Sequence, residues 1–85
     1  MNISEIERMD SAVEEAKANN RRRNDILNTI DYIKAGNKPR VEIGFADESD
    51  FLFIDVEESL IMALLQDELV KAEQRIRDFK WPSST

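Results

Sequence analysis

The chain has 85 residues, of which 18 are acidic and 12 basic, a formal net charge of −6 at pH 7, and neither cysteine nor histidine. These counts exclude a disulfide framework, a thiolate metal site and any catalysis or metal binding through imidazole. The acidic excess repels nucleic acid over most of the surface, which disfavours direct nucleic-acid binding and restricts any contact with phosphate to a local site.

The length predicts one small domain over residues 1–82, followed by a disordered tail over residues 83–85. Because the core is small and no disulfide or metal can support it, self-association is the remaining way to bury more apolar surface. No apolar run approaches the roughly 18 residues of a membrane span, and the N-terminus lacks the basic start of a signal peptide. We therefore expect a soluble cytoplasmic homo-oligomer, a dimer or larger, with no membrane contact.

A first long helix is predicted to begin at Ser4, whose hydroxyl can form a capping box with Glu7. Its end is indicated by Lys34 in the last turn, by Gly36, which can take a left-handed conformation, and by Pro39. A helix of some 30 residues is about 45 Å long. That length exceeds what a monomer of this size can cover, so part of the helix is expected to meet another chain or water.

The apolar stripe of this helix has a heptad spacing and one polar interruption. Its members are Ile6, Met9, Val13, Ala16, Leu27 and Ile30, with Asn20 and Arg23 at the positions between. Asn20 has two interpretations: a buried amide that pairs with its own copy across a dimer, or the place where the helix leaves the core. Arg23 favours the second, unless a partner carboxylate neutralises it.

The next segment is predicted to be a β-hairpin, with residues 40–45 and 51–54 as strands and an acidic turn between them. If Phe45 lies opposite Phe51, then Ile43 faces Phe53, and one apolar face packs on the helices. That face comprises Val41, Ile43, Phe45, Phe51 and Phe53. Leu52 and Ile54 are left on the other face, where an open strand edge favours pairing with another copy.

A second helix is predicted from a cap at Asp55 or a neighbour, supported by Glu58, to a stop at Pro82. Its stripe is Met62, Leu65, Leu69, Ala72, Ile76 and Phe79. The fold class is therefore α+β: long helix, β-hairpin, long helix (αββα), with antiparallel helices meeting along a coiled-coil-like seam in an oligomer. The predicted oligomer interface is Leu52, Ile54, Ile61, Met62, Leu65, Leu69 and Ile76.

The main candidate site is a basic run inside this acidic chain. It comprises Arg21, Arg22 and Arg23, supported by Lys17, Asn20 and Asn24. Guanidinium groups bind phosphate or carboxylate bidentately, so a pocket formed by several subunits could hold a small anionic ligand. Three consecutive residues spread over about 200° of a helix, so they cannot all point at one site in one chain. The alternatives are a solvated face, intersubunit ion pairs with Glu14, Glu15 or Asp25, and contact with an acidic partner protein.

Other chemistry has little support, so we expect no enzymatic activity, no metal and no cofactor. The acidic turn lacks the ligand spacing and central glycine of a calcium loop, and two glycines form no phosphate-binding loop. Acids at the start of the second helix are explained by the helix dipole. Trp81 is interpreted as a lid on the helix end or as an anchor for a partner.

In its size, acidity, lack of Cys and His, and helix–hairpin–helix layout, the chain resembles the small accessory proteins encoded by phages, several classes of which inhibit or sequester components of bacterial defence. The resemblance implies a stoichiometric binding protein that captures a host protein or a small anionic ligand, and it carries over no site residue. Two alternatives stay open. One is an acidic mimic of nucleic acid, using Glu5, Glu7, Asp10, Glu14 and Glu15; the other is a structural connector in a larger assembly.

Overall fold

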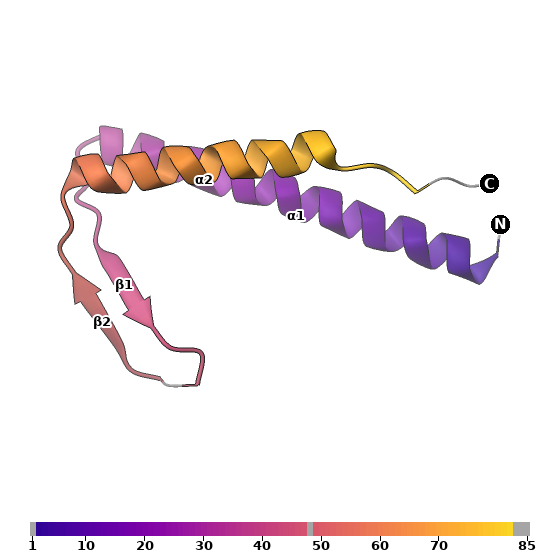
Figure 1. Cartoon of the computed structure of the whole chain (residues 1–85), viewed down its shortest axis with the longest axis horizontal. Helices are drawn as coiled ribbons and strands as arrows, with labels where there is room; N and C mark the ends of the chain where they lie inside the picture. Colours follow the sequence, from indigo (N-terminus) through magenta and orange to yellow (C-terminus); the bar gives the residue numbers. More distant parts are fainter. Residues whose placement is uncertain (1, 48, 83–85) are drawn as a thin grey trace.

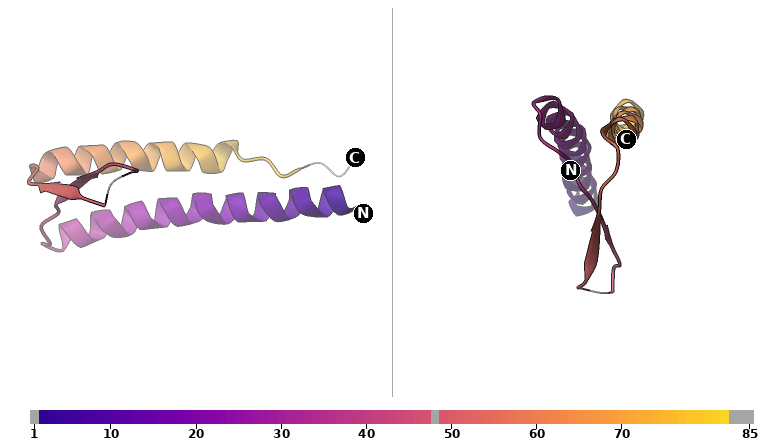
Figure 2. Two further views of the ribbon diagram at one scale, coloured as in Figure 1. Left: turned by 90° about the horizontal axis from the view of Figure 1, so that it is seen from below. Right: turned by 90° about the vertical axis from the view of Figure 1, so that its left-hand side faces the viewer.

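The computed structural model describes residues 2–47 and 49–82. It contains helix α1 (Ile3–Lys34), strands β1 (Val41–Gly44) and β2 (Phe51–Ile54), and helix α2 (Glu58–Asp78) (Figure 1). Helix α2 runs back along α1 in the opposite direction, and the hairpin projects from the end where the helices are connected (Figure 2). This architecture confirms the predicted αββα fold. The predicted tail, residues 83–85, lies outside the described residues.

Helix α1 begins earlier than predicted. Asn2 is its N-cap, in an extended backbone conformation, and its side-chain oxygen accepts a 2.8 Å hydrogen bond from the Glu5 amide. The predicted cap at Ser4 is therefore wrong. The side chain of Asn2, two residues earlier, already accepts a hydrogen bond from a free N–H of the first turn. The predicted end is confirmed: Lys34 is the last helical residue and Gly36 has a φ of 100°.

The contact between the helices defines a seam on α1 that differs in phase from the predicted stripe. Its residues are buried or half-buried at spacings of four and three: Ala12, Ala16, Asn19, Arg23, Ile26, Ile30 and Ile33. The seam and the predicted stripe share Ala16, Arg23 and Ile30, but Asn20 and Leu27 are exposed. Asn20 is therefore outside the core of the single chain, and its half-buried neighbour Asn19 lies in the seam instead; pairing of Asn20 with its own copy across a dimer stays a prediction.

Helix α2 packs on α1 with the predicted stripe. Ala72 joins Ile26 and Ile30 in the core cluster, and the three apolar residues that pack against it are Met62, Leu65 and Leu69. The N-cap is Glu57, without a side-chain capping bond, rather than Asp55. The helix ends at Asp78, and Phe79 already has an extended backbone. The stop therefore precedes Pro82 by several residues.

The hairpin differs from its predicted pairing by one residue. Gly44 lies opposite Phe51 and Ile43 opposite Leu52, which places Phe45 in the turn. A one-residue slip moves every side chain of one strand to the other face relative to its partner strand, so Phe51 and Phe53 share a face with Glu42, and Leu52 shares one with Ile43. The rings of Phe51 and Phe53 meet edge to face, with their centroids 5.0 Å apart.

The hairpin does not pack on the helices, contrary to prediction. Over the described residues, the strands contact each other and neither α1 nor α2, and the hairpin stands away from one face of the helix pair (Figure 2). The molecule is therefore elongated, 53 × 31 × 17 Å, with a radius of gyration of 17.6 Å. A compact chain of this length would have a radius near 12 Å. Neither helix has the length and apolar composition that crossing a membrane requires.

Candidate functional site

An open hollow of about 500 Å³ lies along the middle of α1, beside the segment that follows α2. We call it the basic hollow. Its lining residues are Val13, Ala16, Lys17, Asn20, Arg21, Asn24 and Trp81. The six residues from α1 recur at intervals of three, four, seven and eight, which place them on one face of a helix. The hollow therefore unites Lys17, Asn20, Arg21 and Asn24, four of the six predicted ligand-binding residues.

The basic hollow is positively charged although the chain is acidic. Lys17 and Arg21 line it, and no acidic residue does. Lys17 Nζ lies 3.8 Å from Glu14 Oε1, a long and solvent-exposed pair, while Arg21 forms no ion pair in the described part of the chain. The hollow at the hairpin base has mixed charge: Asp55 and Glu58 line it beside Lys38 and Arg40.

Polar groups in the basic hollow are partly used by the helix itself. Asn20 Nδ2 donates a 2.9 Å hydrogen bond to the carbonyl oxygen of Ala16 in its own helix. This bond orients the Asn20 amide along α1. The hollow thus combines two cations, amide groups and an indole. Such a set can hold an anion together with an attached planar ring.

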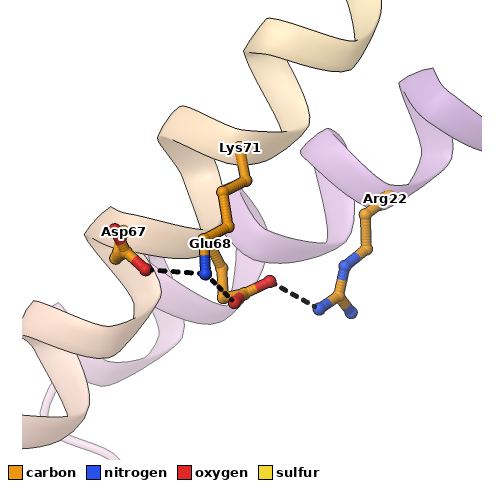
Figure 3. Close-up of polar contacts among 4 residues, drawn as sticks. All are labelled: Arg22, Asp67, Glu68 and Lys71. Carbon is orange, nitrogen blue, oxygen red and sulfur yellow. Dashed lines mark hydrogen bonds and ion pairs between the residues drawn. The ribbon is translucent and has the colours of Figure 1, made fainter.

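Arg22 points away from the basic hollow and bridges the two helices. Its Nη2 lies 3.4 Å from Glu68 Oε2, and Lys71 Nζ lies 3.4 Å from Glu68 Oε1 and 3.0 Å from Asp67 Oδ2 (Figure 3). Asp67, followed by Glu68, raises the pKa of Lys71 above its ordinary 10.5. One arginine of the predicted site is thus paired within the chain, and exposed pairs of this kind contribute little to stability.

Arg23 lies in the seam, half-buried, on another side of α1. Its Nε is buried and has no hydrogen-bond partner in the described residues. Arg23 therefore does not line the basic hollow. The aliphatic stem of Arg23 occupies a core position of the helix pair.

The predicted oligomer interface divides between the helix pair and the hairpin. Ile61 is buried, Ile76 is half-buried, and Met62, Leu65 and Leu69 pack against the core cluster of the same chain. These five residues are thus used largely for packing α2 on α1. The other two lie on the hairpin, where Leu52 is exposed and Ile54 half-buried. Only these two remain outside the helix pair.

Trp81 is the site residue that sequence reasoning missed. Its ring is exposed, meets Phe79 edge to face at 5.1 Å between centroids, and lines the basic hollow. The signal that could have found it is the antiparallel return of α2, which brings the segment after this helix alongside the middle of α1. Because Trp81 lies after α2 and outside its apolar stripe, the spacing of residues within the helix does not predict its position at the hollow.

The acidic residues do not form a comparable site. Among residues 2–47 and 49–82, no cluster of three or more carboxylates is placed to hold a metal ion. Of the acids considered for nucleic-acid mimicry, Glu5 is half-buried and Glu14 lies beside Lys17. Comparison of the chain with protein-family models, curated proteins and solved structures found no match.

Proposed function

We propose that this chain is a non-enzymatic binding protein that captures a small anionic ligand stoichiometrically in the basic hollow, and that it works as a homo-oligomer. The observation that carries the proposal is the convergence of Lys17, Arg21 and Trp81 on one hollow without acidic lining, in a chain of net charge −6. An arginine fork suits phosphate oxygens, and an indole face suits a planar base. A nucleotide is the ligand class that combines both groups.

The side chains that line the hollow support a stoichiometric role. They include no carboxylate, thiol or imidazole that could act as a general base or nucleophile. Such a lining favours holding a ligand over transforming it. The resemblance to phage accessory proteins supports the same role, with sequestration of a signalling nucleotide or of a host defence protein in the cytoplasm.

The experiment uses Trp81, the only tryptophan of the chain, as a reporter inside the site. Its fluorescence is titrated with ATP, and with pyrophosphate to test the phosphate contribution without the ring. The expected result is saturable quenching by ATP at one ligand per chain. Arg21→Ala should weaken this binding roughly 10–100-fold, since a hydrogen bond to a charged group contributes about 1.5–3 kcal/mol.

Arg22→Ala is the matched control, because it removes the same charge from the next residue, which pairs with Glu68 outside the basic hollow. Binding by this variant should stay within about twofold of the unmodified chain, since only a screened surface charge is lost. Equal losses in both variants would show that net charge alone attracts the ligand. Unchanged Trp81 fluorescence with both probes would refute nucleotide capture.

A further inference from the structure

The hairpin lacks the support that a two-stranded sheet needs. It contacts neither helix over its described residues, and its large apolar side chains are mostly exposed: Ile43, Phe45, Phe51, Leu52 and Phe53. An isolated two-stranded hairpin is at best marginally stable in water. A further strand paired with this hairpin would supply the support that the two strands lack.

The two outer edges of the hairpin differ in chemistry. The edge of β2 reads Phe51-Leu52-Phe53-Ile54, without a charge, a proline or a glycine. The β1 edge carries Glu42 and Gly44 within the strand, whereas the charges nearest to β2, Asp50 and Asp55, lie just outside it. A charge within a strand disfavours further pairing at its edge, and a glycine weakens the strand, so β2 is the more favourable edge for another strand.

The exposed area agrees with a partner. The chain exposes 7059 Å², whereas a compact monomer of its mass, 9.9 kDa, would expose about 5,200 Å². The excess exceeds the roughly 800 Å² that each partner buries in a standard interface. A second copy of the chain can cover this surface on every molecule, because each copy is present in the same amount as its partner. In a two-fold contact, the same surface of both copies forms the interface.

We propose that β2 pairs edge to edge with β2 of a second copy, antiparallel across a two-fold axis, to form a four-stranded sheet in the order β1-β2-β2-β1. Apolar cross-strand pairs among Phe51, Leu52, Phe53 and their copies stabilise this pairing. The inference specifies the self-association included in the proposed function and is independent of the basic hollow. Its test therefore reads association without any ligand.

The chain contains no cysteine, so single cysteines can map the contact. Leu52 and Ile43 are cross-strand partners in the hairpin, exposed by 63% and 43%. In the proposed sheet, position 52 lies beside its copy, whereas the two β1 strands are about 14 Å apart. Leu52→Cys should therefore oxidise to a covalent dimer, while Ile43→Cys should stay a monomer on a denaturing gel.

Charge pairs provide the second arm, with mass measured by light scattering. Leu52→Lys should weaken association at least roughly tenfold, because like charges opposite each other destabilise paired strands, and mixing it with Leu52→Glu should restore the dimer. Ile43→Lys is the matched control and should remain dimeric. Equal dissociation by both lysine variants would indicate face-to-face docking and overturn the edge pairing. A single-chain mass for the unmodified protein at millimolar concentration would also overturn it.

Discussion

Three adjacent arginines have three different environments, because successive residues of an α-helix point about 100° apart. Arg21 lines the basic hollow, Arg22 pairs with Glu68, and Arg23 enters the seam. The run is therefore one feature in the sequence and three in the molecule. Only the first of them lines the basic hollow.

Arg23→Leu is predicted to stabilise the chain. The substitution removes a buried Nε–H without a partner, whose desolvation costs about 1–3 kcal/mol, and keeps an apolar stem in the seam. A gain of about 1 kcal/mol raises the melting temperature of a chain this size by roughly 4–8 °C. Thermal denaturation followed by circular dichroism at fixed protein concentration measures the shift.

Arg22→Leu is the comparison for this prediction, since its side chain is more than half exposed and Nη2 already has a partner in Glu68. It should leave the melting temperature within about 2 °C, as surface substitutions generally do. If Arg23→Leu lowers the melting temperature, the guanidinium has a stabilising partner and its Nε is not an uncompensated group.

The sequence could locate the ends of α1 only in part. Gly36 was predicted correctly, because few other residues adopt a positive φ without strain. At the start, Asn2 and Ser4 are both good caps, and each is followed three residues later by glutamate. Local chemistry allowed either. The backbone of Asn2 is extended and its oxygen reaches the Glu5 amide, which decides between them.

At the scale of the elements, α1 carries two overlapping heptad phases. Ala16, Arg23 and Ile30 belong to both, whereas Ile26 belongs to the seam and Leu27 to the predicted stripe. The sequence of α1 alone supports either phase. Contact with α2 selects the seam, which leaves Leu27 exposed with Ile6 and Met9. The sequence thus predicted that the helices pair, but not which side of α1 faces α2.

Ile26→Ala and Leu27→Ala test this phase with neighbouring residues of equal size. Ile26 is 4% exposed and Leu27 39% exposed. Removing Ile26 should lower the free energy of unfolding by about 2–4 kcal/mol, and removing Leu27 by less than about 1 kcal/mol. Urea denaturation at one protein concentration measures both. The reverse order of losses would show that the helices meet along the predicted stripe in solution.

The register of the hairpin was predicted wrongly for a related reason. Pairing Phe45 with Phe51 assumed that the helices bury one aromatic face, and a buried face specifies register strongly. In residues 2–47 and 49–82 the hairpin contacts neither helix, so this constraint is absent there. Gly44 lies opposite Phe51 instead, where a Cβ on the glycine would be 3.7 Å from the Phe51 Cβ. The pairing of β1 with β2 therefore does not require an aromatic residue opposite Phe51.

For the whole molecule, the candidate site was predictable in its α1 part and not beyond it. Lys17, Asn20, Arg21 and Asn24 share one helix face, which follows from their spacing. Trp81 joins them only because α2 ends at Asp78 and the chain then continues in extended form beside α1. That stop comes without a glycine or proline at the helix end, so tertiary placement rather than a local signal completes the basic hollow.

The elongated shape leads to a last prediction: stability should rise with protein concentration. A monomer unfolds at the same temperature at any concentration, whereas a dimer gains about 1.4 kcal/mol per mole of dimer for each tenfold increase. The melting temperature of the unmodified chain should therefore rise by several degrees over a hundredfold range. Leu52→Lys should flatten this dependence, because Leu52 is exposed in the single chain and its replacement alters association rather than the fold.

Amide hydrogen exchange, measured on the same two proteins over the same concentration range, distinguishes the hairpin from the helices. Amides of α1 and α2 are hydrogen-bonded within each helix, so their protection should persist in Leu52→Lys. Among the described residues, the outward amides of β2 have no partner strand, so the proposed pairing with a second copy should protect them. Protection over Phe51–Ile54 should thus increase with concentration in the unmodified chain and disappear in the variant. Equal, concentration-independent exchange in both proteins would mean that the strands are completed by something other than this chain.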